Sequence, residues 1–155
     1  MMIPKEFFVT SGKAISSVSE LNAFDLALEK AGIAQCNLVY VSSILPPKCR
    51  FVDYKRIPTG AITFVVMSKM SGRGGERISA GLIWGFGEDE DYGIVAEAHG
   101  NYDGDEIRSI LESRLAEMAR VRGIKIKKLN YRVETMDVPD EYYGCVLAAI
   151  VYLNY

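Results

Sequence analysis

The residues of this chain best placed to do chemistry are two adjacent serines, Ser42 and Ser43. A serine hydroxyl cannot stabilise a carbanion, but a serine that attacks the peptide bond before it can be converted to a ketone, which can. Two prolines follow at 46–47, and because they lack N–H groups the preceding strand must end there in a rigid turn. A fold can hold a peptide bond in such a place in a strained, reactive geometry. We therefore consider Ser43 a candidate precursor of a covalent cofactor.

The serine pair has a second interpretation, an ordinary strand end capped by hydroxyl groups. About one adjacent serine pair is expected by chance in a chain of this length, and Ser16-Ser17 is another one here. The two pairs differ in context, because the branched and aromatic residues 37–41 before Ser42 are typical of a short buried strand. The residues alone leave both interpretations open.

Two carboxylates are further candidates. Glu97 lies among small and apolar residues of an expected strand, on the same face as Val95, which favours burial. A buried carboxyl has a raised pKa and can donate a proton near neutral pH, whereas an outward-facing one is an ordinary surface residue. Asp25 lies within an expected helix, where aspartate is unfavourable unless it caps or binds something. Its neighbours Phe24 and Leu28 are expected to face inward, so Asp25 can flank a pocket.

Several other kinds of site have little support. The single histidine, His99, is better explained as a surface or turn residue than as a member of a catalytic triad, since no glycines flank the serine pair as in a nucleophile elbow. One histidine without paired carboxylates predicts no metal site. The glycine-rich segment 71–75 lacks the ending of a phosphate-binding loop, and we expect a hairpin tip there. Residues 124–128 alternate as an edge or half-exposed strand does, and we expect their lysines to be solvated.

The composition is that of a globular protein with one domain. Of its 155 residues, 49% are hydrophobic and 25% are charged, and this length allows a substantial core. A net charge of −2 with dispersed lysines argues against a nucleic acid or an anionic membrane as partner, and no apolar run is long enough to span a bilayer. Cys36, Cys49 and Cys145 form neither a zinc pattern nor a disulfide framework, so we expect a reducing cytoplasm.

Periodicity predicts a mixed α and β domain with more strands than helices. A first helix is predicted over residues 21–30, begun by a capping box at Ser17 or Asn22 and ended by Gly32. Its predicted buried face is Leu21, Phe24 and Leu28. A second helix begins at Asp103 or Asp105 and ends before Gly123, with Ile107, Ile110, Leu111, Leu115 and Met118 inward. The other predicted strands lie near residues 5–15, 60–70, 77–86, 92–98, 129–133 and 143–153.

The order of these motifs closely resembles that of the pyruvoyl-dependent arginine decarboxylases. The resemblance covers nearly the whole chain, so it is far more specific than any one motif. The residues that carry it are 21–25 (Leu-Asn-Ala-Phe-Asp), 31–33 (Ala-Gly-Ile), Asn37-Leu38, Ser42-Ser43-Ile44, Pro46-Pro47, 58–61, 75–80, the strand of Glu97, and 143–145.

The resemblance implies that the chain cuts itself between Ser42 and Ser43 without hydrolysis. The Ser43 hydroxyl attacks the Ser42 carbonyl to give an ester, and elimination with loss of ammonia leaves a pyruvoyl group. This covalent group, without metal or pyridoxal phosphate, would be the cofactor. It would begin an α chain of residues 43–155, with residues 1–42 remaining as a β chain of the same single domain.

The resemblance also implies roles for three other residues. Asn37 corresponds to the family's asparagine near the cofactor, where its amide would stabilise an oxyanion during processing or orient the pyruvoyl carbonyl. Glu97 corresponds to the glutamate that returns a proton to the substrate's α carbon. Asp25 corresponds to a substrate-side aspartate, suited to bind a guanidinium group through a forked contact.

The fold that the resemblance implies is an α+β, four-layer αββα sandwich assembled as a trimer or a dimer of trimers, with active sites between subunits. The reaction that it implies is decarboxylation of L-arginine to agmatine and carbon dioxide. Two alternatives remain: a pyruvoyl enzyme acting on another amino acid, such as lysine or ornithine, and a non-enzymatic oligomeric scaffold that never cleaves.

Overall fold

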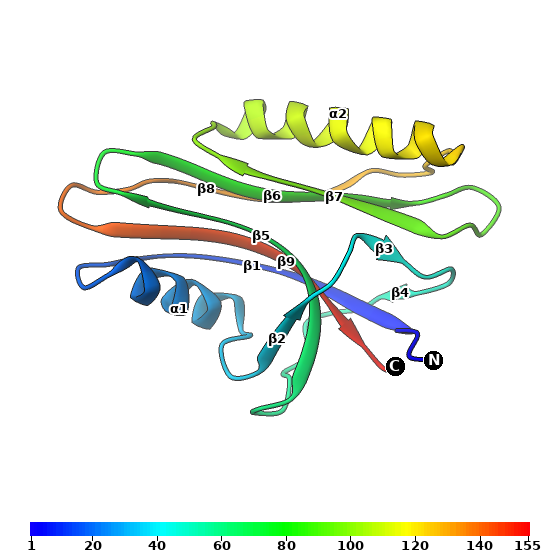
Figure 1. Ribbon diagram of the computed structural model, residues 1–155, viewed down its shortest axis with the longest axis horizontal. Coiled ribbons are helices and arrows are strands. Elements are labelled where there is room, and N and C mark those ends of the chain that lie inside the picture. The colour runs from blue at the N-terminus through cyan, green and yellow to red at the C-terminus, as the bar shows by residue number, and fades with distance from the viewer.

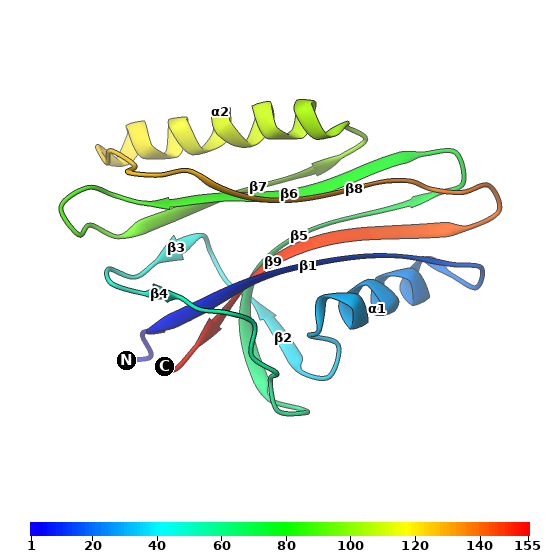
Figure 2. The same cartoon turned by 180° about the vertical axis from the view of Figure 1, so that it is seen from behind.

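The strongly apolar runs of the sequence become strands of two β-sheets that pack face to face, with one helix against each outer face (Figures 1 and 2). The computed structural model describes residues 1–155. One sheet has five strands in the order β2-β5-β9-β1-β4, and the other has four in the order β3-β7-β6-β8. The predicted α+β domain is confirmed, and no helix has the length and apolar character needed to cross a membrane.

The five-stranded sheet consists of β1 (Glu6–Ser16), β2 (Asn37–Tyr40), β4 (Arg50–Phe51), β5 (Ile62–Arg73) and β9 (Tyr143–Leu153). The four-stranded sheet consists of β3 (Ile44–Leu45), β6 (Arg77–Phe86), β7 (Gly93–Gly100) and β8 (Asn130–Asp137). The helices are α1 (Glu20–Ala31) and α2 (Gly104–Arg122). In Figure 1, α1 lies against the five-stranded sheet and α2 against the four-stranded sheet.

Strand β9 is the centre of the fold because both of its faces are apolar. It pairs antiparallel with β1 along the whole of that strand and with β5 on its other side. Its side chains alternate between two cores, as a strand requires. Leu147 and Ala149 pack toward α1, whereas Ala148 and Ile150 pack between the two sheets. A nearly continuous apolar run is the expected sequence of such a doubly covered strand.

Helix α1 is confirmed, but two of its predicted details are wrong. Its N-cap is Ser19, whose side chain accepts a hydrogen bond from the Asn22 N–H, rather than Ser17 or Asn22. Its buried face consists of three alanines, Ala23, Ala27 and Ala31, while Leu21 is 74% exposed and Phe24 and Leu28 are half-buried. Small side chains let the helix approach the sheet closely, which moves the larger ones to the margins of the contact.

The predicted hairpin tip at residues 71–75 is wrong, because the strands on either side belong to different sheets. β5 pairs with β2 and β9, whereas β6 pairs with β7 and β8. Gly72 still belongs to β5, and Gly74 and Gly75 form the turn between the layers, with a φ of 87° at Gly75. The predicted edge strand at 124–128 is also wrong, since it forms only an isolated bridge between Gly87 and Ile126.

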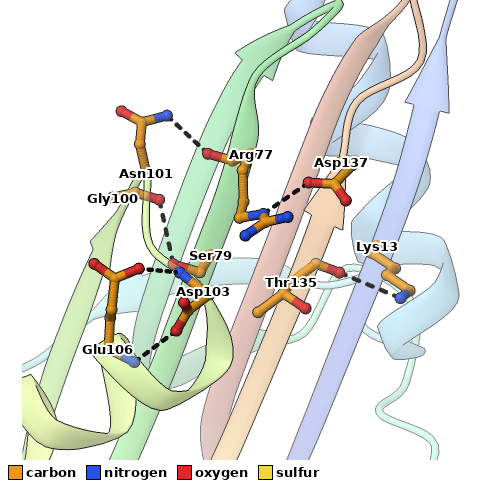
Figure 3. Close-up of polar contacts among 9 residues, drawn as sticks. All are labelled: Lys13, Arg77, Ser79, Gly100, Asn101, Asp103, Glu106, Thr135 and Asp137. Carbon is orange, nitrogen blue, oxygen red and sulfur yellow. Dashed lines mark hydrogen bonds and ion pairs between the residues drawn. The ribbon is translucent and has the colours of Figure 1, made fainter.

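Helix α2 agrees with its sequence pattern. Asp103 caps it in a capping box with Glu106, and Gly123 ends it with a φ of 67°. Its buried face is Ile107, Leu111, Leu115 and Ala119, with Ile110 and Met118 half-buried beside them. Figure 3 shows polar contacts just before the start of the helix: Asn101 donates to the Arg77 carbonyl oxygen (2.9 Å), and Ser79 donates to that of Gly100 (3.3 Å). Beside them, Arg77 of β6 pairs with Asp137 of β8 (2.8 Å).

Candidate active site

The serine pair lies where the chain passes from one sheet to the other. β2 is an edge strand of the five-stranded sheet, paired in parallel with β5, and β3 pairs with β7 in the four-stranded sheet. Residues 41–43 connect them, as the rise of the chain from β2 to β3 in Figure 1 shows. The prediction of a buried strand before Ser42 is wrong, because β2 is an edge strand whose side chains are mostly exposed.

Hydrogen bonds hold the backbone on both sides of the Ser42–Ser43 bond. The Val41 N–H donates to the Val65 carbonyl oxygen at 2.9 Å, and the Val95 N–H donates to the Ser43 carbonyl oxygen at 2.9 Å. One residue further on, the Tyr152 hydroxyl donates to the Ile44 carbonyl oxygen at 2.7 Å. Burial raises the pKa of Tyr152, so its hydroxyl stays protonated and remains a donor. The peptide bond between the serines is therefore fixed relative to both sheets.

Both serines face a cavity of about 500 Å³ together with Glu97. Ser42 is exposed and Ser43 is half-buried, so a reactant can reach both. The other residues of the cavity come from the connection between β2 and β3 and from β5, β7 and α2: Val41, Val66, Val95, Ala96, Ser113, Arg114, Glu117 and Met118. Ser43 and Glu97, two candidates identified from the sequence, thus line the same cavity, although they are far apart in the chain.

Glu97 lies on the part of β7 that extends beyond β3. The prediction that its side chain is buried is wrong for the single chain, in which it is exposed. Even so, loss of water around the carboxyl group raises its pKa above the ordinary 4.5, against the smaller opposing effects of His99 and Arg114. His99, two residues on, is exposed, as predicted. The raised pKa is what a proton donor needs near neutral pH.

Arg114 is a cavity residue that the sequence analysis missed. Its Nη1 donates to the Glu97 carbonyl oxygen at 2.7 Å, which connects α2 to the open edge of β7. The neighbouring Glu117 is held by Arg120 through two contacts of 2.8 and 2.6 Å. A signal for Arg114 exists in the sequence, because it lies midway between Ile110 and Met118 in a stripe of four-residue spacing beside the buried face.

Asn37 and Asp25 do not line this cavity in the single chain. The Asn37 side-chain amide donates to the Gly60 carbonyl oxygen at 2.9 Å at the edge of the five-stranded sheet. Asp25 is exposed on α1, which covers the outer face of that sheet. The structure therefore brings Ser42, Ser43 and Glu97 together, and it leaves the other two predicted residues apart from them.

A second cavity, of about 380 Å³, lies beside Ser42 and is mainly apolar. Its lining includes Met2, Val41, Ile44, Phe64 and Tyr155. Val39, Tyr40 and Ile62, on the paired strands β2 and β5, also have exposed apolar side chains.

The polar side chains outside this region offer no alternative centre. No group of three or more His, Cys, Asp or Glu side chains is arranged to hold a metal ion. The three cysteines are free, and burial raises the pKa of the Cys49 thiol to about 11 and that of Cys145 above its usual value.

Comparison with known proteins identifies the family. The model of the pyruvoyl-dependent arginine decarboxylase family matches residues 6–155. A pyruvoyl-dependent arginine decarboxylase of Methanothermobacter thermautotrophicus is 39% identical over 99% of this chain and 100% of its own length. One of Methanopyrus kandleri is 35% identical over 98% and 99%, and pyruvoyl-dependent arginine decarboxylase 2 of Archaeoglobus fulgidus is 37% identical over 96% and 97%. The chain therefore belongs to the pyruvoyl-dependent arginine decarboxylase family of enzymes.

Proposed function

We propose that the chain cleaves itself between Ser42 and Ser43 and, once cleaved, decarboxylates L-arginine to agmatine and carbon dioxide. The observation that carries this proposal is the single cavity shared by Ser42, Ser43 and Glu97. A pyruvoyl group made from Ser43 supplies an electron-accepting carbonyl at that place. Neither a metal ion nor pyridoxal phosphate takes part.

Cleavage begins with the Ser43 hydroxyl. Its oxygen bonds to the Ser42 carbonyl carbon, the bond from that carbon to the Ser43 nitrogen breaks, and an ester joins the two chains. Elimination then breaks the bond between the Ser43 β carbon and the ester oxygen, so Ser42 leaves as a carboxylate. Addition of water to the remaining nitrogen-bearing group releases ammonia and leaves the pyruvoyl group on the α chain. The fixed backbone on both sides of the serines keeps hydroxyl and carbonyl in reach of each other.

Glu97 is the proton donor to the substrate's α carbon. Its carboxyl lies in the same cavity as Ser43, and loss of water raises its pKa, so more of it is protonated when substrate arrives. Arg114 opposes that rise electrostatically, and by binding the Glu97 carbonyl oxygen it fixes the position of this part of β7.

The active site is completed by a neighbouring copy of the chain in a trimer or a dimer of trimers of four-layer αββα sandwiches. Two observations support this assembly. Asn37 and Asp25 lie outside the cavity of their own chain, and an exposed apolar surface runs along the β2 edge beside Ser42. In the complete site Asn37 assists cleavage or orients the cofactor, and Asp25 binds the guanidinium group of arginine. The free cysteines fit a reducing cytoplasm.

Product analysis tests this proposal. Purified, cleaved protein is incubated separately with arginine, lysine and ornithine, and the amines are separated by chromatography. We expect agmatine as the main product. We also expect Asp25→Asn to impair arginine binding more than cleavage, because the amide cannot form the charge-assisted fork. Preferential turnover of lysine or ornithine would replace the substrate assignment, and an intact chain without any product would support the scaffold alternative.

A further inference from the structure

We propose that the backbone N–H of Val95 is a catalytic donor in self-cleavage, where it stabilises the charge that builds on the Ser43 carbonyl oxygen during elimination. This inference rests on the proposed cleavage at Ser42–Ser43, and it adds a group that no side-chain pattern reveals.

The contact is present before cleavage. The Val95 N–H lies 2.9 Å from the Ser43 carbonyl oxygen, one residue beyond the β3–β7 pairing of Ile44 with Ile94. Val95 is fully buried, and its side chain belongs to the core between the sheets. A donor in such a place is rigid and poorly hydrated, so its interaction with a developing charge is stronger than it would be in water.

The chemistry explains why this oxygen matters. In the ester, the proton on the Ser43 α carbon must leave to a base, which can reach it through the open cavity. The electron pair of that C–H bond forms the double bond to the β carbon as the bond to the ester oxygen breaks, and Ser42 departs as a carboxylate. Charge that develops on the α carbon is shared with the adjacent Ser43 carbonyl oxygen. The Val95 N–H is already in hydrogen-bond contact with that oxygen.

The donor therefore acts on one step and not on the other. Attack of the Ser43 hydroxyl on Ser42 places charge on the Ser42 carbonyl oxygen, which Val95 does not contact. Removal of the Val95 N–H should slow elimination and leave ester formation intact, so the ester should accumulate. If this contact is only a β-ladder hydrogen bond, its removal should not make the ester accumulate.

The test replaces one amide of the chain by an ester. Incorporation of 2-hydroxy-3-methylbutanoate at position 95 removes the N–H and keeps the side chain. The matched control places lactate at position 98, because the N–H of Ala98 lies on the opposite edge of β7, toward β6. Val95→Ala, which keeps the N–H, is a second control. Val95→Pro removes the same N–H by an encoded substitution, and β6 pairing does not need that donor. Circular dichroism verifies the fold of each variant.

Cleavage is followed by mass spectrometry with and without hydroxylamine, which cuts esters. We expect chains that lack the N–H at position 95 to cleave between Ser42 and Ser43 about 10²–10³-fold more slowly, as for loss of one oxyanion donor. Hydroxylamine should then release residues 1–42 and, from Val95→Pro, an α chain that begins with serine. In the two ester variants it also cuts the introduced ester before position 95 or 98, so in the position 95 variant the expected product is a shorter fragment that begins with Ser43. Cleavage at the unsubstituted rate, equal slowing at positions 95 and 98, or slowing without ester would each overturn the inference. Failure of the unsubstituted chain to cleave would instead overturn the proposed function.

Discussion

Replacement of Glu97 by glutamine separates its proposed chemical role from any structural one. Glu97→Gln keeps the shape of the side chain but removes the transferable proton. The carboxylate takes part in none of the ion pairs of the chain, and Arg114 contacts only the main-chain oxygen of this residue. The substitution therefore leaves no partner unpaired, and we expect the free energy of unfolding to change by no more than about 0.5 kcal/mol.

The expected effect on turnover is much larger. A general acid contributes about 10²–10⁴-fold to the rate, which corresponds to about 2.7–5.4 kcal/mol of transition-state stabilisation at 1.36 kcal/mol for each tenfold. Cleavage at Ser42–Ser43 should proceed normally, because Glu97 acts only on the bound substrate. A variant that cleaves, folds and turns over slowly is thus the specific expectation.

The pH dependence gives a second measure. The folded-state pKa of Glu97 is raised above the ordinary 4.5, so the folded protein favours the protonated form. The protonated Glu97 side chain therefore stabilises the folded protein at pH values below 4.5. This stabilisation is lost as the pH rises through the pKa of Glu97 in the folded state. Relative to the wild-type chain, Glu97→Gln should become more stable as pH increases over this window. The decarboxylation rate of the wild-type enzyme should fall with rising pH as Glu97 loses its proton. The pH–rate profile of the Glu97→Gln variant should not show this fall.

The assay measures chain cleavage by denaturing electrophoresis and carbon dioxide release on the same preparation. Glu88→Gln, in an exposed loop, controls for loss of a carboxylate at the surface. Cleaved protein with near-normal turnover would remove Glu97 from the mechanism. Uncleaved protein would move its role from substrate protonation to self-processing.

Three further predictions follow from the cofactor and the core. Decarboxylation should be indifferent to chelators and to pyridoxal phosphate but should be lost with hydroxylamine or with borohydride plus substrate, and stimulation by pyridoxal phosphate would contradict the pyruvoyl assignment. Leu115→Ala should lower the free energy of unfolding in urea by about 2–5 kcal/mol, because this residue is 1% exposed beneath α2; a change below that range would mean the core closes around the missing atoms. Iodoacetamide should modify half-buried Cys36 before buried Cys49, whose thiol has a pKa of about 11, and early labelling of Cys49 by peptide mapping would refute its burial.

The sequence was sufficient to predict elements whose pattern reports a local property. The two helices end at the predicted glycines, because only a residue tolerant of positive φ fits there. The apolar run at 143–153 becomes the central strand β9. The segment 71–75 was misassigned because turn composition says that the chain reverses, but not whether the next strand joins the same sheet. Whether the next strand joins the same sheet depends on which apolar sheet faces must be buried in the whole fold.

Prediction of the site was limited in a similar way. Ser42, Ser43 and Glu97 were identified by residue type, and they share one cavity. The burial of Glu97 was overestimated, because alternation along a strand does not show where its neighbour β3 ends. Arg114 was missed because a charged residue on a helix is most often a solvated one. No side-chain pattern identifies the Val95 N–H, since every residue except proline carries this group.

The intact mass of the purified chain under denaturing conditions tests the central claim most directly. We predict two species, residues 1–42 ending in the Ser42 carboxylate and residues 43–155 lighter by one ammonia than a fragment that begins with serine. Ser43→Ala should give one uncleaved chain, whereas the matched Ser17→Ala, in the other serine pair, should cleave like the wild-type chain. A wild-type protein that remains a single chain of 155 residues, or a Ser43→Ala variant that still cleaves at this bond, would contradict the assignment of Ser43 as the cofactor precursor.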